Sequence, residues 1–132
     1  MATQSFDLKA RLANRREPFL FSWMTIPSPQ LAGQLARLPI EGVCLDMQHG
    51  TIGFSDAAPM IAAISSAGRP AIARILWNEP GLIGQVLDAG AAAVIVPMVN
   101  SKEQAEAAVK AAKYPPLGGR SWGGYTAFQT YG

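Results

Sequence analysis

The stretch "LDMQHG", residues 45–50, places an acid, an amide and the chain's only histidine at the end of an apolar run. Arg74 stands late in another apolar run, "AIARIL". A buried guanidinium must either pair with a carboxylate or bind an anion. The alternatives for Arg74 are therefore a structural ion pair with Asp46 and a binding site for an anionic ligand. A lone histidine in a glycine-flanked loop, such as His49, is by spacing alone more often an exposed or capping residue than a catalytic one.

The elements that must position these residues alternate along the chain. Apolar and β-branched runs predict strands at 19–26, 42–47, 70–76 and 92–99. Each run is followed by a helical pattern, at 30–38, 55–67, 80–89 and 101–114. The expected helix caps are Ser55, Asn78 and either Asn100 or Ser101, and the expected stops are Gly68 and Gly90. Residues 114–132 are predicted to be a glycine- and proline-rich loop.

Continuous apolar strands that alternate with helices indicate a parallel sheet covered by helices. Such a sheet is either open and doubly wound or part of an eight-stranded barrel. The G-x-G-x-x-G motif of nucleotide-binding open sheets is absent after the first strand, where Ile26 is followed by "PSPQLAG". Polar residues instead follow the second, third and fourth strands, which is where a barrel carries its active site.

Composition narrows the class of protein. The 132 residues are 49% hydrophobic and 15% charged, which is typical of one globular domain. A net charge of +2 is too small to indicate a nucleic-acid partner, and no apolar run is long enough to cross a membrane. Cys44, the single cysteine, is expected to pack as a small hydrophobe in a reducing cytoplasm. The main basic residues are expected on a solvated N-terminal helix: Lys9, Arg11, Arg15 and Arg16.

The motif "LDMQHG" followed by "ARILWNEPGLIGQVLDAGAAAVIVPMVNSKEQAEAAVKAAKYPPLGGRS" resembles the HpcH/HpaI family of class II, metal-dependent 2-oxo acid aldolases. The similarity extends from "FSWMTIPSP" at 21–29 to "YPPLGGRSWG" at 114–123. The resemblance implies a (β/α)8 TIM barrel, of which residues 1–132 form a single partial domain with about the first four βα units. The implied reaction is the cleavage of a 4-hydroxy-2-oxo acid into pyruvate and an aldehyde, or the reverse addition.

The resemblance also assigns roles to residues of this chain. Arg74 is expected to bind the substrate and stabilise the enolate of pyruvate. His49 is expected to transfer the proton of the aldehyde oxygen, oriented by a hydrogen bond that it donates to the Asp88 carboxylate. Asp46 is expected to support the site without touching substrate. The remaining substrate-binding residues are predicted to be Gln48, Trp23 and Arg120, although many relatives carry a glutamate in place of Gln48.

The family uses a divalent cation such as Mg²⁺, Mn²⁺ or Co²⁺, which stabilises the enolate as a Lewis acid. By resemblance, its two carboxylate ligands lie on the fifth and sixth strands, beyond Gly132. We therefore expect no metal ligand in this chain and little activity from it alone. The open edges and the uncovered inner face of a half barrel predict that the chain either self-associates into a two-fold barrel-like dimer or folds poorly, and by resemblance a homo-oligomer is expected.

Three hypotheses follow from these observations. The chain is part of a metal-dependent aldolase, a module that binds 2-oxo acids or other small anions without chemistry, or a non-catalytic half-barrel. Anion binding without metal dependence would favour the second hypothesis, and no binding at all would favour the third.

Overall fold

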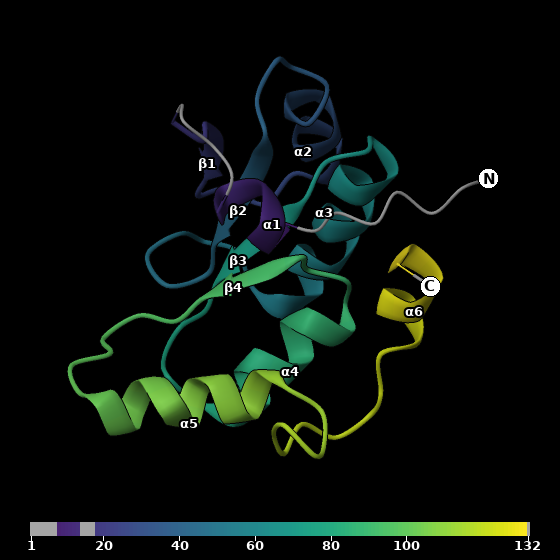
Figure 1. The fold of residues 1–132 in the computed structure, drawn as a ribbon. Coiled ribbons are helices and arrows are strands. Elements are labelled where there is room, and N and C mark those ends of the chain that lie inside the picture. Colours follow the sequence, from purple (N-terminus) through teal and green to yellow (C-terminus); the bar gives the residue numbers. More distant parts are fainter. Residues whose placement is uncertain (1–7, 14–17, 132) are drawn as a thin grey trace.

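The structure is a computed structural model that describes residues 8–13 and 18–131. Its centre is a four-stranded parallel sheet in which each strand pairs with the next one along the chain (Figure 1). The strands are β1 (Phe21–Met24), β2 (Gly42–Asp46), β3 (Ala71–Arg74) and β4 (Ala93–Ile95). All four lie within the predicted ranges and are shorter than predicted.

The helices follow the predicted alternation, with one short helix before the sheet and one after it. They are α1 (Leu8–Ala13), α2 (Pro29–Leu35), α3 (Phe54–Ser66), α4 (Pro80–Asp88), α5 (Lys102–Ala112) and α6 (Tyr125–Tyr131). The predicted N-terminal helix is α1, and Arg15 and Arg16 of the basic stretch lie outside the described residues. In the described part of the chain, no helix is both long and apolar enough to span a membrane.

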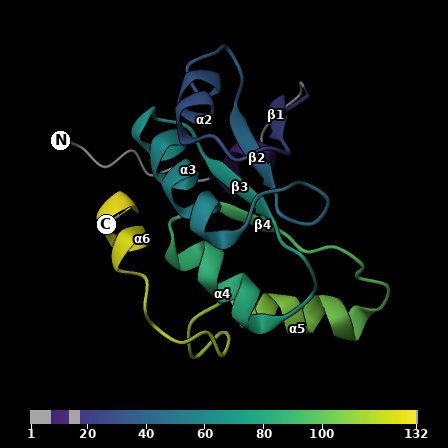
Figure 2. The same ribbon diagram turned by 180° about the vertical axis from the view of Figure 1, so that it is seen from behind.

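The strand order favours one of the two predicted architectures. A doubly wound sheet reverses its strand order at a switch point and carries helices on both faces. Here the order is β1-β2-β3-β4, and α2, α3 and α4 cover the same face (Figure 2). This arrangement is that of consecutive units in a (β/α)8 barrel.

The two faces of the sheet differ in how much they are covered. Val43 and Leu45 of β2 point into the main core, which they share with α3 and α4. Cys44 points to the opposite face, where it packs with Ile72 of β3 and Leu8 of α1. This second face is only partly covered, because Trp23 of β1 is 48% exposed. Among the described residues, Leu8 of α1 packs over part of this face.

Most helix ends follow local side-chain chemistry. The predicted stops Gly68 and Gly90 have φ values of 77° and 97°, a left-handed conformation that glycine adopts without strain. Ser101 caps α5 by accepting a hydrogen bond from the backbone N–H of Gln104, as predicted. Two predicted caps are wrong. Gly53 and not Ser55 caps α3, and Glu79 and not Asn78 caps α4.

The C-terminal segment also differs from its prediction as a loop. Residues 125–131 form α6, which packs against α4. Its sequence, "YTAFQTY", is rich in aromatic and β-branched residues that favour helices only weakly. Tertiary contacts therefore determine this helix, and propensity could not indicate it.

Candidate functional site

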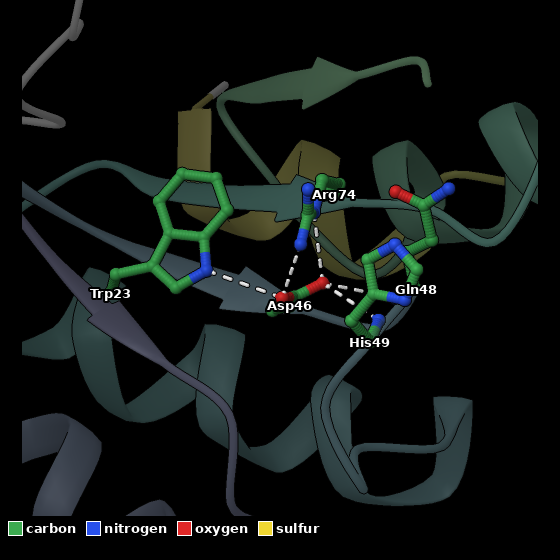
Figure 3. Close-up of polar contacts among 5 residues, drawn as sticks. All are labelled: Trp23, Asp46, Gln48, His49 and Arg74. Atoms are coloured by element: carbon green, nitrogen blue, oxygen red, sulfur yellow. Dashed lines mark hydrogen bonds and ion pairs between the residues drawn. The ribbon is translucent and has the colours of Figure 1, made fainter. Parts of the chain in front are cut away.

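The polar residues of the "LDMQHG" motif and Arg74 meet at the carboxyl edge of the sheet. Asp46 ends β2, Arg74 ends β3, and the two residues are register partners. Gln48 and His49 follow in the turn after β2. Figure 3 shows the indole of Trp23 on one side of Asp46, and Gln48 and His49 on the other.

Asp46 is the centre of this arrangement, and its side chain is only 3% exposed. Its Oδ1 accepts hydrogen bonds from Arg74 Nε at 2.9 Å and from the backbone N–H groups of Gln48 at 3.0 Å and His49 at 3.1 Å. Its Oδ2 accepts from Arg74 Nη2 at 2.5 Å and from Trp23 Nε1 at 3.3 Å. Five donors therefore surround one carboxylate.

These donors fix the charge of the pair. The Arg74 guanidinium, followed by the backbone and indole donors, holds the pKa of Asp46 well below its usual range, although burial opposes this shift. The hydrogen bonds to Asp46 in turn raise the pKa of Arg74. Both partners are therefore charged at neutral pH. The structural ion pair that the sequence left as an alternative is present.

The ion pair leaves part of Arg74 available. Its Nε and Nη2 bind Asp46, and among the described residues nothing accepts a hydrogen bond from Nη1. The side chain is 24% exposed, while its Cζ lies 5.0 Å from the centre of the Trp23 ring. Arg74 can therefore direct free N–H groups at an anionic ligand without breaking its contact with Asp46.

The turn after β2 brings His49 back toward Asp46. A Cβ atom on Gly50 would lie 2.3 Å from the backbone oxygen of Asp46 and 2.7 Å from that of Thr25, so only glycine permits this approach. The backbone N–H of Thr51 also donates to Thr25 O at 2.8 Å. The turn is thus tied to β1 and β2, while the His49 side chain is exposed.

Cys44 lies in the same strand but is not a candidate nucleophile. It is 1% exposed, and burial, followed by the nearby charge of Asp46, raises the pKa of its thiol to about 12. The thiol stays protonated at neutral pH. The interpretation of Cys44 as a packing residue is consistent with both observations.

Asp88 and Arg120 lie apart from this cluster. Asp88 is the last residue of α4. Because α4 runs antiparallel to the strands, it ends near their amino ends, whereas His49 follows the carboxyl end of β2. Its Oδ1 accepts a hydrogen bond from Arg120 Nη2, and the Arg120 guanidinium lies over the ring of Tyr114, with Cζ 4.6 Å from its centre. In the part of the chain that the structure describes, the expected hydrogen bond between Asp88 and His49 is absent.

The Asp88–Arg120 pair forms one wall of a cavity of about 590 Å³. Gln85 and Ser121 line the same cavity. The glycine-rich loop allows the close approach, because a Cβ on Gly123 would lie 3.3 Å from Asp88 Oδ2. The predicted substrate-binding residue Arg120 thus lies beside Asp88 and not beside Arg74.

The described residues do not fit a divalent cation. No group of three or more histidine, cysteine, aspartate or glutamate side chains lies close enough to hold one, among residues 8–13 and 18–131. Asp46, the carboxylate at the site, already accepts five hydrogen bonds.

Comparisons with known proteins show the family to which the chain belongs. The model of the HpcH/HpaI aldolase/citrate lyase family matches residues 20–129. A hydroxypyruvate/pyruvate aldolase of Rhizorhabdus wittichii is 41% identical over 110 residues, which cover 83% of this chain and 44% of the relative. A 2-dehydro-3,6-dideoxy-6-sulfogluconate aldolase of Pseudomonas putida is 35% identical over 121 residues, which cover 92% and 48%.

Solved structures of the family have the same fold. An HpcH/HpaI aldolase from Desulfitobacterium hafniense superposes with a TM-score of 0.83 at 25% identity, covering 93% of this chain and 48% of that structure. A family protein from Burkholderia cenocepacia gives 0.83 at 30% identity, covering 93% and 51%. These likenesses confirm the predicted fold, four βα units of a TIM-barrel family. The chain spans about half the length of the proteins it matches.

Proposed function

The chain belongs to the HpcH/HpaI aldolase/citrate lyase family, and on that premise we propose that it forms part of an aldolase site for 4-hydroxy-2-oxo acids. The reaction is cleavage into pyruvate and an aldehyde, or the reverse addition. The relatives named as aldolases support the class of reaction, a carbon–carbon lyase. Residues 1–132 are proposed to be the first half of one barrel domain.

The observation that carries this proposal is the state of Arg74. Its guanidinium is held by a buried carboxylate through two hydrogen bonds and keeps Nη1 free at the carboxyl edge of the sheet. When the bond between C3 and C4 of the substrate breaks, its electrons move to the C2 carbonyl and form an enolate oxygen. Arg74 Nη1 donates to that oxygen, where a fixed cation is worth most because the charge appears only during the reaction.

His49 is the proposed proton carrier. A neutral imidazole accepts the proton of the C4 hydroxyl as the C3–C4 bond breaks, and the aldehyde leaves. The enolate then takes a proton at C3 from the His49 imidazolium, directly or through a water molecule, which gives pyruvate and restores the neutral imidazole. The His49 backbone is held by Asp46, while its imidazole has no partner among the described residues and is free to meet a substrate. Gln48, from the same turn, is proposed to bind the substrate.

The family's divalent cation remains part of the proposal for the complete enzyme. Because the described residues do not fit a cation, we derive no step of the reaction through it. The roles of Arg74 and His49 given above depend only on their own charges and protons. Homo-oligomer formation and a cytoplasmic location also remain proposals.

The test is pyruvate release from 4-hydroxy-2-oxoheptanedioate by the purified protein, with Mn²⁺ present and again with EDTA. Residues 1–132 alone are expected to release little pyruvate, because the described residues offer no cation site. In a protein that also supplies the cation ligands, we expect metal-dependent release that falls by about 10²–10⁴-fold in His49→Ala, because general acid–base catalysis contributes on that order. Asp56→Asn, a change at the first turn of α3, is the control and should leave the rate unchanged. Measurable release that is equal in the wild type and His49→Ala would contradict the proposal.

A second function is favoured by one observation. The site offers free guanidinium donors, whereas the described residues hold no metal cluster. Binding of pyruvate or another 2-oxo acid without turnover is the expected property of such a site. Calorimetry with pyruvate in EDTA distinguishes the two functions, because affinity that depends on Arg74 without product release would indicate a binding module.

A further inference from the structure

We infer that Trp23 is a positioning residue, whose indole holds the guanidinium of Arg74 in its working orientation through contacts with both Asp46 and Arg74. The sequence indicated a residue that touches substrate. This inference rests on the proposed function, since it concerns how Arg74 is presented to an enolate.

The contacts form a closed triangle across three strands. Trp23 lies on β1, beside β2, and its Nε1 donates to Asp46 Oδ2 at 3.3 Å. The same oxygen accepts from Arg74 Nη2 on β3. The third side is the stacking of Arg74 over the Trp23 ring, with 5.0 Å between Cζ and the ring centre.

Each contact restrains a different motion. The two hydrogen bonds between Arg74 and Asp46 lie in the plane of the guanidinium, and they fix its direction only if the carboxylate itself cannot rotate. Two backbone donors hold Oδ1, but Trp23 is the only described residue other than Arg74 that donates to Oδ2. The indole ring also covers one side of the guanidinium, so a ligand must approach Nη1 from the remaining directions.

Both contacts of Trp23 depend on its residue type. Among the aromatic side chains, tryptophan combines the strongest cation–π platform with an N–H donor on the ring. Both properties are used at this position.

Positioning and direct contact predict different kinetics. Every aldol reaction of the site passes through the same pyruvate enolate, so a misplaced Arg74 slows all substrates equally. It also slows exchange of the methyl protons of pyruvate with D₂O, which involves no aldehyde. A residue that contacts the aldehyde changes the relative rates of different aldehydes and leaves this exchange unaffected.

The experiment compares Trp23→Phe, which keeps a ring and loses the N–H, with Trp23→Leu, which loses both. Trp77→Phe is the matched control, because Trp77 is 57% exposed and makes no polar or ring contact with Asp46 or Arg74. We expect methyl-proton exchange to fall about tenfold in Trp23→Phe and further, toward a hundredfold, in Trp23→Leu, since small displacements at a reacting centre have effects of that order. The ratio of rates for two aldehydes should not change.

A second measurement does not need activity. NMR relaxation of the Arg74 Nε–H group should report a rigid side chain in the wild type and Trp77→Phe, and a mobile one in Trp23→Phe. Equal rigidity in all three proteins overturns the inference, as does a rate loss that varies with the aldehyde. Mobility in Trp23→Phe together with an inactive wild type would support the restraint of Arg74 and refute the proposed function instead.

Discussion

Two arginine–aspartate pairs lie near opposite ends of the strands. The more buried partner is the carboxylate in one pair and the arginine in the other. In the Asp46–Arg74 pair the carboxylate is 3% exposed and the arginine 24%. In the Asp88–Arg120 pair the arginine is 9% exposed and the carboxylate 30%. The buried member of each pair anchors the exposed one. The first pair therefore presents a cation to its surroundings, and the second presents an anion.

The supports of the pairs differ as well. Both partners of the first pair end strands, and the backbone and an indole complete the shell of Asp46. Among the described residues, the second pair joins a helix end to a glycine-rich loop through one hydrogen bond, and none of them accepts a hydrogen bond from the buried Nε of Arg120. A saturated pair on strands is suited to hold a fixed charge, whereas the second pair has unused hydrogen-bonding capacity.

The largest effect should come from the exposed cation of the first pair. Arg74→Lys should lower pyruvate methyl-proton exchange by about 10²–10³-fold, because an ammonium cannot bind Asp46 through two parallel bonds and still direct a donor at the enolate. Arg120→Lys is the matched change in the other pair. NMR in D₂O measures both. Equal losses in the two variants would remove the functional distinction between the pairs.

The next effect concerns the buried carboxylate. Asp46→Asn should lower the free energy of unfolding by about 2–3 kcal/mol, since a buried acceptor of charged donors is lost and the new amide directs N–H groups at existing donors. Urea denaturation at neutral pH measures it. If the variant were as stable as the wild type, the groups that donate hydrogen bonds to Asp46 would have rearranged without a cost in free energy.

The stabilisation by Asp46 should also depend on pH. Its pKa in the folded state lies below its ordinary value near 3.8, so the charged form stabilises the fold above that value. The contribution is lost as pH falls below the ordinary value toward the lower pKa of the folded state. Wild type and Asp46→Asn should therefore differ by a constant amount near neutral pH and converge in strong acid. A difference that stays constant into strong acid, measured by urea denaturation over this range, would show that another group is responsible.

A smaller effect is expected from the exposed anion of the second pair. Asp88→Asn should cost about 1 kcal/mol or less, because ion pairs with a solvent-accessible partner contribute little. The same variant tests the predicted link between Asp88 and His49. A loss of pyruvate release without a matching loss of stability would support that link, for which the described residues of one chain provide no contact.

The smallest effect, a gain in stability, should come from Gly84, which lines the cavity beside Asp88. Gly84 lies inside α4, and a Cβ there would meet nothing within 4 Å. Gly84→Ala should raise the free energy of unfolding by about 0.5–1 kcal/mol through helix propensity, with activity unchanged. Thermal denaturation measures the gain. If the variant were more stable but less active, the cavity beside Asp88 would be shown to contribute to activity.

Features that depend on residues close together in the sequence could be predicted from it, whereas most contacts between distant residues could not. The strands were predictable from continuous apolar runs between helices, whereas their order stayed open between a doubly wound sheet and a barrel until the polar strand ends and the family resemblance favoured the barrel. The Asp46–Arg74 pair was a stated alternative, because a buried arginine needs an anion. The bond from Trp23 to Asp46 was not, since it depends on the register of β1 against β2.

Other differences came from competition among neighbouring groups. Gly53 is the N-cap of α3, because the backbone N–H of Gly53 donates a hydrogen bond to the Asp56 carboxylate at 3.1 Å. The helix therefore starts before Ser55. Glu79 outcompetes Asn78 by accepting hydrogen bonds from two backbone N–H groups. The Asp88–Arg120 pair joins residues 32 positions apart through a loop whose course no local pattern indicates.

The pairing of each strand with its successor has a consequence for the order of folding. All five residues of the Asp46 cluster lie at positions 23 to 74, in three consecutive strands and the turn after β2. During synthesis the cluster therefore has all its parts once β3 has left the ribosome, before α4 and the Asp88–Arg120 pair exist.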